Sequence, residues 1–430
     1  MLNRFTLIRP SRLIPTIIGG QCLLWIVFFP EVPKIDNAEP KCHDLGAYLM
    51  FGALFTVLMV GVMIGEGLRV EQADLSQHQR EANASRLFNL GRWVFWPMVF
   101  SLAVQFRLFL QSPERMTQAL VEASGLNSAT AEMRTNTISG IASFSTLLMV
   151  TVVCMALAEQ SSLLEPRKRR TARRYLVCSG VMILFMSTFG AARQFLLLYF
   201  AVLLCAWAIG RKRISRPRVA LILLAGIAVF WAQTLSRQGT FIAQRDQMPL
   251  LSWHVQERIC AELVEGYLPG EFNRTLIVFS YPADPGRNFL YGTAFDRFHL
   301  GYSPEGRNLN TFNALGIWYW QLGTASLFLA FGFGFWIGRI YRKAIQHGFQ
   351  LDVPTCTLLL ALAGVYTMVR DNFLFLQFYL VPLLFLFFCN ALWLGKSAKN
   401  PTLGAGLSIV RVKNLALPSG SYLPDSEPIR

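Results

Sequence analysis

The stretch YLVCSGVMILFMSTFGAARQFLLLYFAVLLCAWAI, residues 175–209, consists of two apolar runs separated only by Gly-Ala-Ala-Arg. Each run has the composition and approximate length of a helix that crosses a membrane. The pair therefore predicts a helical hairpin with Arg193 in its tight turn. A guanidinium beside so much hydrocarbon is costly, so Arg193 is by default a candidate functional residue.

The whole chain has the composition of a membrane protein. Of its 430 residues, 53% are hydrophobic and 15% are charged, and the mean hydropathy is +0.40. An average soluble domain has about 25% charged residues, so soluble classes are excluded. We expect an all-α polytopic membrane protein. The ten apolar stretches predicted to span the membrane are residues 13–30, 46–65, 93–111, 138–158, 175–191, 194–210, 219–235, 312–337, 354–369 and 372–394.

The net charge of +15 is concentrated in short segments beside these spans. Alternate connections, counted with both chain ends, hold 26 of the 40 Lys and Arg, including the run RKRRTARR at residues 167–174. Basic segments stay on the cytoplasmic side, so both ends of the chain are predicted to be cytoplasmic. This distribution is a topology signal and does not indicate nucleic acid as a partner.

The predicted topology divides the chain into four parts: residues 1–235 with seven spans, a long periplasmic loop at 236–311, residues 312–395 with three spans, and a cytoplasmic tail at 396–430. Within the loop, apolar side chains at four-residue spacing predict an amphipathic helix at 252–268 that lies on the membrane surface. The rest of the loop is rich in Gly, Pro and Asn and is expected to form turns and irregular structure. The tripeptide at 273–275 matches a glycosylation acceptor, but so short a match carries little weight.

Arginines mark the predicted outer ends of the helices and the long loop, and no lysine accompanies them from the third span onward. A guanidinium stays charged when partly desolvated and binds phosphate bidentately, so the pattern suggests a pyrophosphate-bearing ligand. The alternative is that each arginine separately reaches lipid headgroups. The candidate binding residues are Arg107, Arg193, Arg237, Arg245, Arg287 and Arg370, with Asn308 and Asn310.

The long loop also holds the candidate acids and bases. Imidazole suits proton transfer near neutral pH, although a loop histidine is more often a solvated surface residue. The candidates are His299, Asp296 and Glu305, with His254 and Asp284 as further choices. No nucleotide-binding glycine loop or Cys/His cluster is present, so no cofactor and no metal are expected. Cys42 and Cys260 are both predicted to face outward, and a disulfide between them stays an open alternative.

Two segments carry a resemblance to a known family. NLNTFNALGIWYWQLGTASLFLAFGFGFWIGRIYRKA, residues 308–344, resembles the late segment of the O-antigen polymerases, in which an Asn-containing loop enters a glycine-bearing helix with a basic end. GAARQFLLLYFAVLLCAW, residues 190–207, is similar to the family's small-residue, arginine and leucine-rich span. The long outer loop between the seventh and eighth spans also fits.

The resemblance implies a bacterial inner-membrane glycosyltransferase with the multi-helix, GT-C-like bundle of lipid-linked-sugar transferases. Such an enzyme joins undecaprenyl-pyrophosphate-linked oligosaccharide repeats at the periplasmic face, without a metal. The resemblance also implies membrane lipids and a chain-length regulator protein as partners. Gly323, Gly332, Gly334 and Gly338 would allow either close helix packing or a lipid groove.

Two alternatives remain. The related O-antigen ligases carry a His-Asn pair where the loop enters the eighth span, whereas this chain has Asn308 and Asn310 and no histidine there. A flippase or transporter would also bind anionic lipid-linked sugars, but the chain has no half-to-half repeat of the kind that transporters show.

Overall fold

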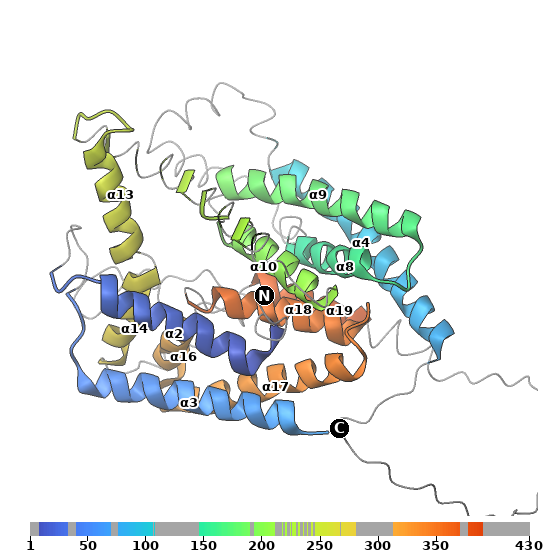
Figure 1. The fold of residues 1–430 in the computed structure, drawn as a ribbon, viewed down its shortest axis with the longest axis horizontal. Coiled ribbons are helices and arrows are strands. Elements are labelled where there is room, and N and C mark those ends of the chain that lie inside the picture. Colours follow the sequence, from blue (N-terminus) through green and yellow to red (C-terminus); the bar gives the residue numbers. More distant parts are fainter. Residues whose placement is uncertain are drawn as a thin grey trace, which may run out of the picture.

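The computed structural model describes residues 8–32, 40–69, 76–105, 107, 146–189, 193–210, 246–266, 268–280, 313–369 and 377–389, with scattered positions between 217 and 243. In these residues all regular structure is helical (Figure 1). Four stretches are long and apolar enough to cross a membrane: Pro10–Phe28, Leu45–Gly67, Gln77–Val104 and Ala314–Gln346. The expectation of a helical membrane protein is thus supported, while the number of ten spans stays a prediction.

The helices follow the predicted spans with two differences. The third and fifth spans begin inside the basic segments that precede them, and the predicted span 312–337 is divided at Gly323, whose φ of 57° ends one helix before the next begins. The span predicted at 219–235 lies largely outside the described residues. The helices are α2 (Pro10–Phe28), α3 (Leu45–Gly67), α4 (Gln77–Gln105), α8 (Leu148–Gln160), α9 (Pro166–Phe189), α10 (Arg193–Gly210), α13 (Trp253–Gly266), α14 (Leu268–Phe279), α16 (Ala314–Leu322), α17 (Ser326–Gln346), α18 (Val353–Thr367) and α19 (Gln377–Cys389).

Helices α3 and α17 pack backbone to backbone through two pairs of glycines. A Cβ added at Gly61 or Gly65 would lie under 3.0 Å from backbone atoms of α17. A Cβ at Gly334 or Gly338 would meet the backbone of α3 equally closely. Gly61 meets Phe331 and Phe335, and Gly65 meets Phe335 and Arg339. Residue numbers thus increase in the same direction along both helices, so the two helices run parallel. Small residues at this spacing are a common way for membrane helices to approach closely.

The glycines predicted to matter in the eighth span thus have different roles. Gly334 and Gly338 serve helix packing, one of the two alternatives drawn from the sequence, whereas an added Cβ at Gly332 would meet nothing within 4 Å. Gly323 occupies the left-handed φ region at the break between α16 and α17, which an L-residue adopts only with strain.

Helix α2 runs antiparallel to α3. The Arg9 Nε atom, just before α2, lies 2.8 Å from a carboxylate oxygen of Glu66 near the end of α3. Trp25, near the end of α2, has its ring 6.1 Å from that of Tyr48 near the start of α3. The two contacts define the ends of the bundle.

A second group of helices encloses α8 and α18. These two helices are buried almost all round, which explains why their sequences are apolar on every face. The Thr151 hydroxyl of α8 donates a hydrogen bond of 3.2 Å to the Gly91 carbonyl of α4. The Tyr199 hydroxyl of α10 donates one of 2.9 Å to the Leu176 carbonyl of α9. Helices α4, α9 and α10 therefore form the wall around α8 (Figure 1).

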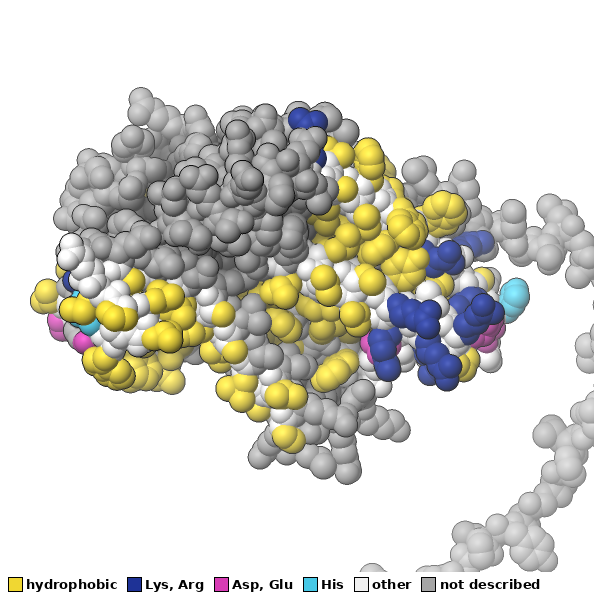
Figure 2. All heavy atoms as spheres, turned by 90° about the horizontal axis from the view of Figure 1, so that it is seen from above, with side chains coloured by type: hydrophobic (Ala, Val, Ile, Leu, Met, Phe, Trp, Pro, Cys, Tyr) yellow, Lys and Arg dark blue, Asp and Glu magenta, His cyan; other side chains and the backbone are white. Residues whose placement is uncertain are grey.

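The surface is apolar in the middle and charged toward the ends. Figure 2 shows lysines and arginines gathered at one end and a broad apolar surface in the middle. Large apolar side chains are exposed on the outer faces of several helices, including Leu23, Leu49, Trp93, Phe100 and Val181. Water would make such exposure costly, whereas lipid tails make it favourable. The middle zone therefore has the character of a lipid-facing belt.

We name each of the two ends of the bundle after one residue that lies there. The Glu66 end contains the starts of α2, α4, α9 and α18 and the ends of α3, α8, α10 and α17. The segments that the charge pattern assigns to one side of the membrane thus come together there. The opposite end contains α14 and is called the Asn273 end. Which compartment each end faces stays a prediction.

The predicted long loop contains more structure than the sequence indicated. Helix α13 agrees with the predicted amphipathic helix, but its apolar face is covered by protein: Val255 and Ile259 are fully buried against residues that include Trp231 and Leu250. Helix α14 forms where turns and irregular loop are expected from residue 270 onward, so that expectation was wrong for 270–279. Burial of Phe272, Leu276 and Phe279 against the bundle stabilises this helix.

Candidate functional site

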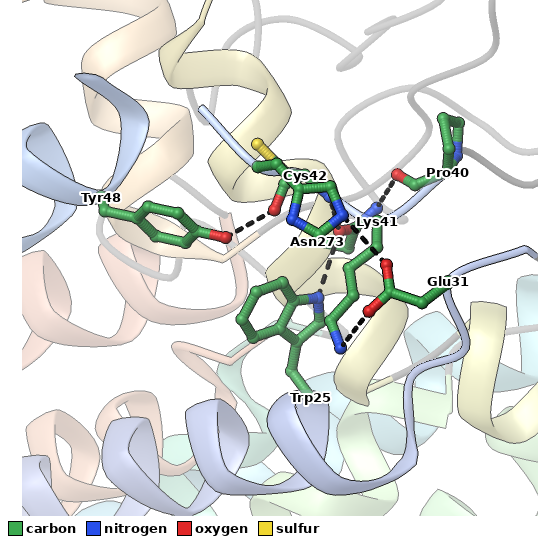
Figure 3. Close-up of polar contacts among 8 residues, drawn as sticks. Trp25, Glu31, Pro40, Lys41, Cys42, Tyr48 and Asn273 are labelled. Carbon is green, nitrogen blue, oxygen red and sulfur yellow. Dashed lines mark hydrogen bonds and ion pairs between the residues drawn. The ribbon is translucent and has the colours of Figure 1, made fainter. Parts of the chain in front are cut away.

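The candidate site is the Asn273 end, where α14 lies among α2, α3 and α16. Asn273 is fully buried, and all of its side-chain polar atoms are used (Figure 3). Its Oδ1 atom accepts hydrogen bonds from Trp25 Nε1 at 3.1 Å and from the Cys42 amide at 2.9 Å. Its Nδ2 atom donates to the Pro40 carbonyl at 2.9 Å. Asn273 therefore fixes α14 to the connection between α2 and α3, and its burial is incompatible with glycosylation in the folded chain.

Charged side chains cover this buried cluster on its solvent side. Glu31 forms ion pairs with Lys41 at 3.3 Å and with His43 at 2.9 Å. The Lys41 ammonium lies 5.1 Å from the centre of the Trp25 ring, within cation–π range. Desolvation raises the pKa of Glu31, but hydrogen bonds from Lys41 and His43 outweigh it, so the net shift is downward. The connection between α2 and α3 is thereby held over the end of α14.

Both ends of the segment 281–312 are fastened at this place. At its start, the Ser280 hydroxyl hydrogen-bonds the carboxylate of Asp44, which also caps the first turn of α3. At its end, the Asn313 amide donates to Thr275 Oγ1 at 2.9 Å, and the Asn313 side chain caps α16. The segment therefore leaves from and returns to the same end of the bundle.

The turn after α18 begins beside these anchors. The Ala314 amide donates to the Met368 carbonyl at 2.9 Å, and Gln21 Nε2 donates to the Val369 carbonyl at 2.7 Å. Helices α2, α14, α16 and α18 are thus joined through polar contacts at a single level. Segment 281–312 and the turn that starts at residue 370 are attached within one neighbourhood.

Most of the predicted site residues lie in those attached segments, outside the described residues. They are Asp284, Arg287, Asp296, His299, Glu305, Asn308 and Asn310 in segment 281–312, and Arg370 in the turn. Arg237 and Arg245 also lie outside the described residues. Their roles stay predictions, and the structure specifies only where the segments that carry most of them begin and end.

Two predicted arginines are described in part. Arg193 is the first residue of α10, and α9 ends at Phe189, so Arg193 begins the second helix of the pair, while residues 190–192 between the two helices lie outside the described residues. It lies at the opposite end of α9 from the basic run. Arg107 is exposed just beyond α4 and has no ion pair among the described residues.

A second polar cluster joins the start of α13 to the preceding turn. His254 Nε2 lies 3.2 Å from Asp246 Oδ2, and Arg258 Nε lies 3.8 Å from the same oxygen. A carboxylate that orients an imidazole is a recurring arrangement for a base, yet the His254 side chain is 46% exposed, which agrees equally with a solvated surface pair. Cys260 on this helix is exposed and Cys42 is buried, and both are free thiols, so the alternative disulfide is not formed.

Few features of the sequence indicate which residues organise this end. Trp25 is not among the predicted residues, and Asn273 and Thr275 enter only as parts of a possible glycosylation tripeptide, because the partners of each come from distant parts of the chain. The one available signal was Asn273 itself, a polar residue followed by the apolar run Leu276–Phe279, read as part of a possible acceptor tripeptide. Among the described residues no group of three or more His, Cys, Asp or Glu could hold a metal ion.

Comparisons of this chain with known proteins identified no relative. No family model, curated protein or solved structure matches the chain.

Proposed function

We propose that the chain is a membrane glycosyltransferase that polymerises undecaprenyl-pyrophosphate-linked oligosaccharide repeats at the periplasmic face of a bacterial inner membrane. One observation supports this function above others: both ends of segment 281–312 and the start of the turn after α18 are fastened at the Asn273 end. The candidate acids and bases His299, Asp296 and Glu305 lie in these two segments, together with two of the six candidate arginines, Arg287 and Arg370. Functional loops held by a rigid scaffold are the usual form of such sites.

The reaction requires an anion site and a base near each other. A hydroxyl oxygen of the incoming repeat forms a bond to the anomeric carbon of the growing chain, and the bond from that carbon to the pyrophosphate oxygen breaks. The hydroxyl proton passes to a base, for which His299, Asp296 and Glu305 are proposed. The leaving lipid pyrophosphate takes the electron pair. Arg193, Arg237, Arg245, Arg287 and Arg370 are proposed to stabilise its charge.

The proposed function can be tested with purified protein and lipid-linked repeat units alone. We expect the repeats to be lengthened in the presence of excess EDTA and without any nucleotide, because no metal or nucleotide motif is present in the sequence. Products are separated by gel electrophoresis and their masses measured. Deletion of the gene should reduce the surface polysaccharide to a single repeat on its carrier.

Three results would contradict the proposal. Activity that is lost in EDTA and restored by a divalent ion would exclude the metal-independent reaction. Transfer of whole chains to a lipid A core, without lengthening, would identify a ligase. Movement of the lipid-linked repeat across vesicles without any new bond would identify a transporter.

A further inference from the structure

The Glu66 end contains a cavity of about 390 Å³ between α2, α3 and α17. Three guanidiniums and one carboxylate line it, together with a small number of apolar side chains. The charged residues are Arg9, Arg12, Arg342 and Glu66. The cavity is at the far end of the bundle from the proposed transfer site, so the proposed function leaves it unexplained.

The single carboxylate is already fully engaged. Glu66 accepts hydrogen bonds from Arg9 Nε at 2.8 Å, from the Ser11 amide at 2.9 Å and from the Ser11 hydroxyl at 3.0 Å. Its side chain is only 8% exposed, so this pairing fixes the position of Arg9 at the cavity wall. The hydrogen bond from Arg9 to Glu66 and the charge of that carboxylate raise the pKa of Arg9.

The other two arginines are not neutralised by any carboxylate of the described residues. Within the described part of the chain neither Arg12 nor Arg342 forms an ion pair, and the buried Nε atom of Arg342 has no hydrogen-bond partner. A buried donor without a partner is costly, and an anion in the cavity would satisfy it.

The position of the cavity indicates which anion it would take. Exposed apolar side chains such as Met63 and Ile64 lie on α3 immediately before Glu66, so the cavity opens where the lipid-facing belt ends. Anionic lipid phosphates are concentrated at that level of a membrane, and basic pockets between helices bind them. Guanidiniums also match phosphate geometry better than ammonium groups do.

We propose that Arg12 and Arg342, together with Arg9 held by Glu66, bind the phosphate of an anionic phospholipid. The bound headgroup bridges the start of α2 and the end of α17, on either side of α3. It thereby stabilises the glycine-packed pair of α3 and α17 at the Glu66 end. A ligand that binds only the folded chain raises its resistance to unfolding in proportion to occupancy.

The test measures lipid binding to the purified full-length protein by native mass spectrometry. Dioleoyl phosphatidylglycerol and dioleoyl phosphatidylcholine are compared, because they share acyl chains and differ in net charge. We expect the wild type to retain phosphatidylglycerol selectively, and Arg342→Gln and Arg12→Gln each to weaken its binding by about tenfold or more, the effect of losing one charge-assisted hydrogen bond. Arg170→Gln is the control, because Arg170 is exposed in the basic run at the same end.

The second measurement is the thermal unfolding midpoint with each lipid and with inorganic phosphate. Phosphatidylglycerol should raise the midpoint of the wild type and of Arg170→Gln but not that of Arg342→Gln. If millimolar phosphate alone gives the same Arg342-dependent increase, the site takes free phosphate as well, and the assignment of the three arginines stands. Equal retention of both lipids by the wild type, or an equal loss in Arg170→Gln, would overturn the proposal. Arg342→Lys, which keeps the charge, shows whether the variants fold.

Discussion

The indole nitrogen of Trp25 donates a hydrogen bond of 3.1 Å to the side-chain oxygen of Asn273, although 248 residues separate them in the chain. The same oxygen accepts the Cys42 amide. One buried side chain therefore joins α2, the start of α3 and α14, and α14 leads directly into segment 281–312. Asn273 therefore positions the helix from which that segment starts.

Replacement of Asn273 by Ala should destabilise the Asn273 end. It would leave the Trp25 indole, the Cys42 amide and the Pro40 carbonyl without their partner, at about 1–3 kcal/mol for each buried group. We expect a lower thermal unfolding midpoint in detergent and faster proteolysis after residue 280. Asn89→Ala, an exposed position on α4, is the matched control. Equal midpoints for the two variants would show that α14 is held in another way.

The packing of α3 on α17 predicts a sharp difference between two glycines of one helix. Gly334→Ala would bring a methyl group under 3.0 Å from the Leu58 backbone, whereas at Gly332 the added methyl group meets nothing within 4 Å. Gly334→Ala should therefore lower the unfolding midpoint. Gly332→Ala should leave it unchanged or raise it slightly, because Ala favours a helix by about 1 kcal/mol over Gly. Equal effects of the two changes would contradict the close contact.

The hydropathy of a segment alone predicts whether that segment can span a membrane, whereas the residues that pack against it come from the whole chain. The four glycines of the eighth span were visible in the sequence, whereas only Gly61 and Gly65 on α3 decide that Gly334 and Gly338 are the packed ones. Helix α14 was missed because Glu271, Asn273 and Thr275 look like loop residues until their buried partners are known. The candidate arginines and bases could be chosen by chemistry, but their mutual geometry depends on segment 281–312.

Thiol labelling tests the predicted topology. Cys260 is exposed on α13, Cys42 is buried, and both are free. A membrane-impermeant maleimide applied to spheroplasts should modify the wild type and not Cys260→Ser. Cys178 is exposed on the apolar part of α9, where lipid tails would exclude a water-soluble maleimide. Labelling of Cys260 only after lysis would reverse the predicted orientation of the whole chain.

Asp44 gives the attachment of segment 281–312 a dependence on pH. Hydrogen bonds from the Ser280 hydroxyl and the Gly46 amide lower the pKa of Asp44. A lowered pKa in the folded state contributes stability that is present above the unfolded value, about 3.9, and is lost as pH falls through the folded value. Below about pH 4 the unfolding midpoint of the wild type should therefore decline more steeply than that of Asp44→Asn. Parallel curves would show that this carboxylate does not couple to folding.

The last prediction concerns Arg193, which begins α10 three residues after α9 ends. As the first residue of a helix of the bundle, Arg193 brings a charge close to the predicted hydrocarbon zone, which is costly without an anion. A lipid-linked pyrophosphate supplies that anion under the proposed function. Arg193→Ala should abolish chain lengthening while expression and the unfolding midpoint are retained. Arg193→Lys should recover little activity, because an ammonium cannot replace the bidentate guanidinium.

The informative comparison is between Arg193→Lys and Arg107→Lys, measured as lengthening of lipid-linked repeats. Arg107 is also a candidate ligand, but it is exposed just beyond α4, where a side chain that only reaches lipid headgroups would tolerate lysine. We expect Arg107→Lys to retain most of the activity and Arg193→Lys to lose most of it. If both lysine variants lengthen repeats as well as the wild type, Arg193 is an interfacial anchor, and the pyrophosphate must be bound by arginines of the long loop.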